Sequence, residues 1–191
     1  MKKTSFPFLF AALLLLTLLA APAFAQSRDH LTPKEVELVQ DSQLLDQRID
    51  VFVKAIERRL MVMNGTQAAN TKQSKKEAEL WGELPKGSRA ELLSDIDRIL
   101  DEAITNIDDV STKDEKNPLL AKAVRRLAAE ATQLKTQLSP LREQAKSEEE
   151  LASLEHLLES GQSIIDATSK LAPTLPETKG KKKKTDKREN N

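Results

Sequence analysis

The sequence predicts an all-α fold, an antiparallel helical bundle of about four long helices with coiled-coil-like packing and a disordered basic C-terminal tail. Three observations predict it. After residue 25 the only aromatic side chains are those of Phe52 and Trp81, although strands favour aromatic and β-branched residues. The same region is rich in Ala, Leu, Glu, Lys, Gln and Arg, which are good helix formers. Helix-capping signals and apolar residues spaced by three and four then mark the individual helices.

Residues 1–25 have the features of a cleavable secretory signal peptide of bacterial type. A positively charged start precedes an apolar run over residues 6–21, and a small-x-small cleavage pattern follows. Ala23 and Ala25 form that pattern, so Gln26 becomes the first mature residue. The alternative is a retained membrane anchor, but the run is shorter than the roughly 20 residues that a transmembrane helix needs. We therefore expect export to the periplasm or the cell exterior, with no transmembrane span after cleavage.

The absence of cysteine excludes disulfide bonds and a lipid-anchored N-terminal cysteine. We therefore expect helix packing alone to stabilise the mature protein. The chain then divides into a signal peptide, an N-terminal lead over 26–32, a helical bundle over 33–171 and a Lys-rich tail over 172–191.

Four helix starts carry recognisable N-terminal signals. The first combines an N-cap threonine, Thr32, with a proline at the first helical position and Glu35 at the third. Two further capping boxes and one Asn-Pro start follow, at Ser88–Glu91, Ser147–Glu150 and Asn117–Pro118. These starts predict helices over residues 33–63, 89–111, 118–146 and 148–171.

Each predicted helix carries an apolar stripe with alternating spacings of three and four, which is typical of left-handed supercoiled packing. In the fourth helix the stripe is Leu151, Leu154, Leu158, Gly161, Ile165 and Thr168. Isolated helices are marginal in water, so each stripe must be buried against its neighbours.

Three features modify this simple pattern. Pro140 predicts a kink or a break of the third helix near Ser139. Residues 75–81 can form a short helix within the longest connection. The first helix has a second apolar flank, which predicts contact with two neighbours or with a partner molecule, and which consists of Leu44, Val51, Ala55 and Val62.

No catalytic, cofactor or metal motif is recognisable. There is no cysteine nucleophile, no Gly-x-Ser-x-Gly and no glycine-rich phosphate loop. The Glu-x-x-His pattern of di-iron bundles is missing because Ser153 precedes His156 by three residues. Asp97 and Asp101 could share one flank of the second helix, and we expect that flank to be a solvated face. We therefore expect a protein that is not an enzyme and has no metal and no cofactor.

Two single residues are candidates for interaction. Arg59 occupies a seam position seven residues after Phe52, where it either fixes helix register while buried or reaches water near the helix end. The cost of an unpaired buried charge favours the second interpretation. Trp81 either anchors a partner or covers the open end of the bundle, and the second is favoured.

The tail is the strongest interaction feature. Residues 177–191 hold seven basic and three acidic side chains, whereas residues 26–176 hold 21 basic and 27 acidic ones, so a basic tail follows an acidic body. Attraction to an anionic envelope surface would be carried by Lys181, Lys182, Lys183 and Lys184. Without interleaved aromatic residues, sequence-specific nucleic-acid binding is not expected.

These observations favour an exported, non-enzymatic structural or macromolecule-binding component of the cell envelope, whose partner is a protein or a second copy. Two alternatives remain open. One is a periplasmic holdase-type chaperone or stress adaptor with an exposed apolar groove. The other is a small-ligand carrier or an enzyme with a site inside the bundle.

Overall fold

The structure, a computed structural model, describes residues 29–66 and 72–171. Within these ranges it contains six α-helices, one 3-10 helix and no strand. The elements are α2 (Pro33–Asp41), α3 (Leu45–Met63), α4 (Lys72–Trp81), α5 (Arg89–Lys113), α6 (Leu120–Leu138), η2 (Ser139–Gln144) and α7 (Glu148–Thr168). The all-α prediction is confirmed, while the signal peptide and the basic tail lie outside the described residues.

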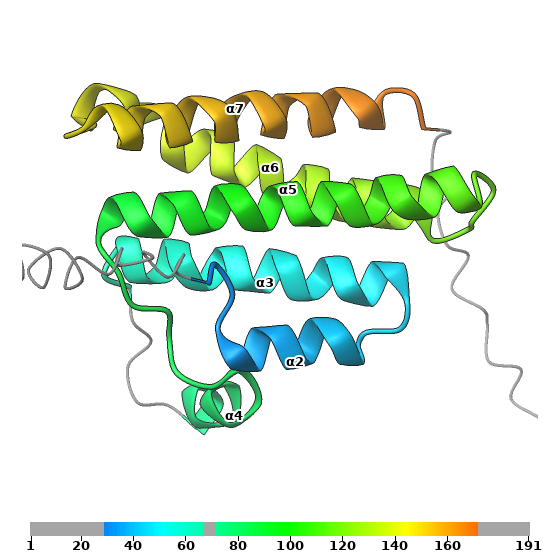
Figure 1. The fold of residues 1–191 in the computed structure, drawn as a ribbon, viewed down its shortest axis with the longest axis horizontal. Helices are drawn as coiled ribbons and strands as arrows, with labels where there is room; N and C mark the ends of the chain where they lie inside the picture. Colours follow the sequence, from blue (N-terminus) through cyan, green and yellow to red (C-terminus); the bar gives the residue numbers. More distant parts are fainter. Residues whose placement is uncertain (1–28, 67–71, 172–191) are drawn as a thin grey trace, which may run out of the picture.

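The four long helices, α3, α5, α6 and α7, lie side by side, and successive ones run in opposite directions along the chain (Figure 1). Around the bundle the order is α3, α5, α7, α6, because α3 and α7 each pack against both α5 and α6. α2 lies on α3, and α4 lies against α2 on the side away from α7 (Figure 1). None of the described helices has both the length and the apolar character that a membrane span requires.

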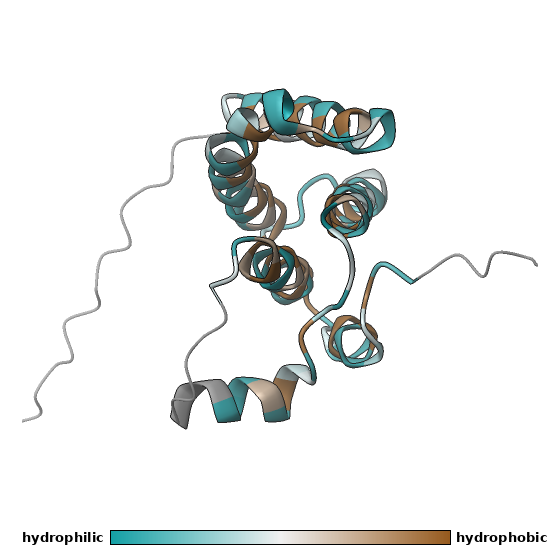
Figure 2. Cartoon of the chain, turned by 90° about the vertical axis from the view of Figure 1, so that its left-hand side faces the viewer, coloured by the Kyte–Doolittle hydropathy of each residue, from teal (hydrophilic) through white to brown (hydrophobic). Residues whose placement is uncertain are grey.

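The core lies between the long helices, where their hydrophobic faces turn toward one another (Figure 2). The predicted stripes of α5 and α6 are buried over most of their length. The seam of α7 differs from the prediction, since Leu157 and Ile164 are buried while Leu158 and Ile165 are only half-buried. α7 contacts both α5 and α6, so it needs a wider apolar face than a single stripe gives.

The predicted first helix over 33–63 is wrong, because the chain breaks into α2 and α3 at residues 42–44. The hydroxyl of Ser42 donates to the carbonyl of Leu38 at 2.8 Å. The carbonyl of Ser42 accepts from Arg48 Nε at 3.1 Å and Nη2 at 3.0 Å. These bonds satisfy backbone groups at the break, and α2 can then fold back beside α3.

This folding back changes the surroundings of the second apolar flank of α3. Ala55 is buried, Val51 and Val62 are half-buried, and Leu44 remains 48% exposed. α3 contacts α5 and α6, which are the two neighbours that the second apolar flank predicts, and the folding back of the chain adds α2 as a third.

The predicted helix starts and interruptions are largely confirmed. Thr32 and Ser88 form reciprocal capping boxes with the glutamates three residues later. Ser147 accepts from the backbone N–H of Glu150, but the Glu150 carboxylate accepts from the Lys146 N–H instead of returning to the cap. The predicted interruption near Ser139 is confirmed, because α6 gives way to η2 at that residue. The predicted short helix over residues 75–81 is present as α4, which begins earlier, at Lys72. α6 begins at Leu120, two residues later than predicted.

Candidate functional site

The sequence-predicted site residues fall into two groups. Ala23, Ala25 and Gln26 of the cleavage pattern lie outside the described residues, as do Lys181, Lys182, Lys183 and Lys184 of the tail. Arg59 and Trp81 lie inside them, and a third residue, Arg58, connects the two.

Arg59 is buried, with 1% of its surface exposed, so the expectation that its guanidinium reaches water is wrong. Its Nη1 and Nη2 lie 3.1 and 2.9 Å from the carboxylate oxygens of Glu35 on α2. It also donates to the carbonyls of Ala55, at 2.7 Å, and His30. The break between α2 and α3 makes this possible, because it returns Glu35 to the side of α3 that carries Arg59.

Arg58 extends the cluster toward α4. Its Nε lies 3.1 Å from Glu35 Oε1, and its Nη2 donates to the carbonyls of Gly82, at 3.4 Å, and Glu83. The guanidinium carbon lies 5.7 Å from the ring centre of half-buried Trp81, within the range of a cation–π contact. Trp81, the last residue of α4, is therefore connected to α3 through Arg58.

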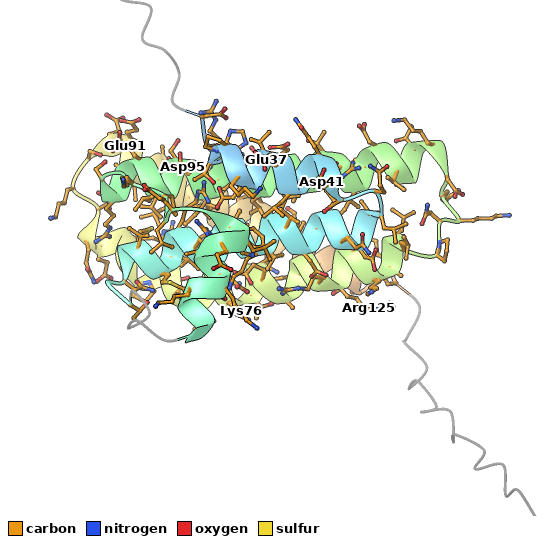
Figure 3. All side chains as sticks on the ribbon, turned by 90° about the horizontal axis from the view of Figure 1, so that it is seen from below. Glu37, Asp41, Lys76, Glu91, Asp95 and Arg125 are labelled. Atoms are coloured by element: carbon orange, nitrogen blue, oxygen red, sulfur yellow. The ribbon has the colours of Figure 1, made fainter. Side chains whose placement is uncertain are left out.

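We call Glu35, Arg58, Arg59, Asp95 and Trp81 the buried charge cluster. Asp95 of α5 completes it, with Oδ2 3.7 Å from Arg59 Nε. Figure 3, seen from the side of α2 and α4, labels Asp95, which is buried, and Glu37 and Lys76, which are exposed. The charges are largely paired and enclosed, so the cluster fastens α2, α3, α5 and the α4–α5 connection together and offers no open site.

An open site lies instead between the C-terminal half of α5, the start of α6 and the C-terminal half of α7. This hollow, which we call the α5–α6–α7 groove, has a volume of about 780 Å³, within the range of small-molecule sites. Its apolar lining includes Ile104, Ile107, Leu120, Val124, Ile164 and Leu171. Most of these side chains are half-buried rather than enclosed, so the groove presents apolar surface that the described part of the chain does not cover.

The rim of the groove is mainly acidic. Asp108, Glu115 and Glu159 line it together with a single lysine, Lys116. His156 lines it as well. An apolar floor with a negative rim attracts ligands that are apolar on one side and positively charged on the other.

His156 connects the groove to a pair of aspartates on α5. Its Nδ1 lies 2.7 Å from Asp97 Oδ1, and this hydrogen bond raises the pKa of the imidazole. Partial burial is the main cause that raises the pKa of Asp97, and it outweighs the opposing effect of His156. Asp97, Asp101 and His156 each place a ligand atom within 4.8 Å of the others.

A second unusual carboxyl group belongs to Glu130 on α6, whose side chain is fully buried. Neither of its oxygens has a hydrogen-bond partner within the described part of the chain, and Arg126 Nη1 lies 3.9 Å away. Burial, reinforced by the negative charge of Glu57, raises the pKa of Glu130 to about 7. It borders a smaller hollow of about 220 Å³ between α3 and α6.

Sequence reasoning missed three of these features. It placed Asp97 and Asp101 on one solvated flank of the second helix, but the approach of His156 to that flank depends on α5 packing against α7. Glu130 lies beside the predicted stripe of α6, and only the position of α3 determines that it is buried. The groove residues Leu120 and Val124 belong to that same stripe, and no sequence signal showed that they remain half-exposed.

In comparisons with known proteins, no protein-family model, no curated protein and no solved structure matches the chain.

Proposed function

We propose that this chain is an exported, non-enzymatic binding protein whose α5–α6–α7 groove holds an apolar, basic segment of a partner protein. The observation that carries the proposal is the groove itself, with half-exposed Leu120 and Val124 on its floor and acidic Asp108 and Glu159 on its rim. Contiguous apolar surface rimmed by polar groups is typical of interaction sites. Charge complementarity favours a basic occupant.

Export is part of the same proposal. It rests on residues 1–25, with cleavage before Gln26. The proposal also includes coiled-coil-like packing of the long helices and attraction of the Lys-rich tail to an anionic envelope surface. The groove favours a second function too, a periplasmic holdase-type chaperone, because unfolded clients expose apolar segments with basic residues.

The test is site-specific photo-crosslinking in the native host. A photo-reactive residue replaces Ser163, which is exposed and lines the groove. The matched control replaces Thr136 on α6, which is exposed and does not line it. Each variant is made in the whole chain and in a version that ends at Pro176, and adducts are mapped by mass spectrometry.

We expect position 163, but not position 136, to capture one partner in both versions through an apolar, basic segment. Many unrelated clients at position 163 would favour the chaperone. Adducts with residues 177–191 of the same chain would show that the tail competes for the groove. Equal labelling from both positions, no adduct from position 163, or capture of an acidic segment would contradict the proposal.

A further inference from the structure

Asp97, Asp101 and His156 bring three potential metal-ligand atoms together beside the groove, whose lining includes His156. Asp97 and Asp101 are four residues apart on α5, so their carboxylates lie on one face of the helix. His156 comes from α7, which packs against α5 along this stretch. The site therefore has three ligands from two rigid helices, which is the support that metal sites require.

The distances suit a transition-metal ion. Ligand atoms of the three side chains all lie within 4.8 Å of one another, and His156 Nδ1 and Asp97 Oδ1 are separated by 2.7 Å. Around Zn²⁺, imidazole nitrogen and carboxylate oxygen bind at roughly 2.0–2.2 Å. Asp101 and His156 are exposed, so small rotations of their side chains can bring all three donors onto one ion.

The donor set also selects among cations. Ca²⁺ and Mg²⁺ prefer six or more oxygen ligands, whereas a neutral imidazole with carboxylates suits zinc and its neighbours in the first transition row. Glu159, one turn after His156 on α7, adds to the negative potential at this point. Three protein ligands leave a further coordination position open to water.

From this geometry we propose that Asp97, Asp101 and His156 bind one Zn²⁺ ion and thereby join α5 to α7 at the rim of the groove. Binding replaces the hydrogen bond between His156 and Asp97 with two bonds to the metal, and any proton on the imidazole nitrogen that becomes the ligand is released to solvent. The proposal departs from the sequence-based expectation of no metal, because that expectation had no information on how α5 and α7 pack. It is independent of what the groove holds.

The test uses untagged, metal-free mature protein, titrated with Zn²⁺ in competition with a chromogenic chelator. We expect one Zn²⁺ per chain, with an affinity that a large excess of Mg²⁺ does not change. His156→Ala and Asp97→Asn should each weaken binding by at least about tenfold, since each removes one of three ligands. Circular dichroism of both variants checks that the helices are retained.

The chain provides a matched control in its only other histidine, His30. His30 also contacts a carboxylate, with Nε2 2.8 Å from Glu102 Oε2, but it belongs to no cluster of three ligands in the described residues. His30→Ala should leave the affinity unchanged, and NMR should show that Zn²⁺ shifts the ring signals of His156 alone. No zinc binding, loss of binding in His30→Ala, or unchanged binding in His156→Ala would each overturn the proposal.

Discussion

Glu35 and Glu130 are both fully buried glutamates that face α3, yet their surroundings are opposite. Glu35 lies between two arginines, with contacts of 2.9 to 3.1 Å, and it also accepts from the Thr32 N–H. Glu130 has no hydrogen bond from the described residues and lies near a second acid, Glu57. Because both carboxylates are equally buried, we expect their different partners to give them opposite contributions to stability.

The difference originates in three consecutive residues of α3. Glu57, Arg58 and Arg59 are separated by about 100° each around the helix axis, so their side chains leave α3 on different sides. The two arginines meet α2, while Glu57 lies on the side of α6. One end of α3 therefore neutralises an acid on one side and repels an acid on the other.

The largest expected effect comes from removing Arg59, one of the two arginines that pair with Glu35. Arg59→Met keeps an apolar stem but leaves Glu35 with only Arg58 as a charged partner, and removing one member of a buried pair costs about 3–5 kcal/mol. Urea unfolding followed by circular dichroism measures the loss. Arg142→Met is the matched control, because the Arg142–Glu155 pair at 3.0 Å is half exposed and exposed pairs contribute about 0–1 kcal/mol. Equal effects of the two substitutions would contradict the assigned role of the cluster.

The next effect comes from removing the charge of Glu130, which accepts no hydrogen bond from the described residues and has only Arg126, at 3.9 Å, as a charged partner. The pKa of Glu130 rises from 4.5 to about 7 on folding, so the folded protein holds this proton more tightly than the unfolded chain does. Glu130 therefore costs no stability below about pH 4.5, and its cost grows as the pH rises to about 7 and then stays constant. A shift of this size corresponds to about 3 kcal/mol.

Glu130→Gln should therefore stabilise the protein by up to about 3 kcal/mol near pH 8 and leave it almost unchanged near pH 4. Unfolding free energies of the wild type and the variant, measured across this range, give the difference directly. Glu35→Gln should destabilise the protein near pH 8, because it removes the charge that the two arginines require. A pH-independent difference between Glu130→Gln and the wild type would show that Glu130 is not the titrating group.

Much of the fold could be predicted because its signals are local. Thr32, Ser88 and Pro140 act on residues within one helical turn, and each marks the start or interruption that the structure shows. The apolar spacing of α5 and α6 likewise depends only on the helical period. Such signals do not depend on which helices become neighbours.

The candidate sites could not be predicted because they depend on which helices pack against one another. The interpretation of Arg59 failed once the break at residues 42–44 was missed, since an unbroken helix could not return Glu35 to the side of α3. The contact of His156 with Asp97 similarly requires that two helices far apart in sequence pack together. The seam position of Arg59 left its burial open, but nothing in the sequence identified Glu35 or Asp97 as the partner of Arg59 or His156.

The smallest expected effect concerns Trp81, whose ring lies beside one of the two arginines that pair with Glu35. The guanidinium carbon of Arg58 is 5.7 Å from the ring centre. Trp81→Phe keeps an aromatic face and Trp81→Leu keeps only apolar surface, so the difference between the two variants isolates the cation–π contact. Trp81→Leu should be less stable than Trp81→Phe by about 0.5–1 kcal/mol, as measured by circular dichroism in urea. If Arg58→Met abolishes this difference, the contact contributes to the stability of the cluster. If the difference persists without Arg58, Trp81 acts through its apolar area alone, and the stability of the cluster rests on Glu35 and its two arginines.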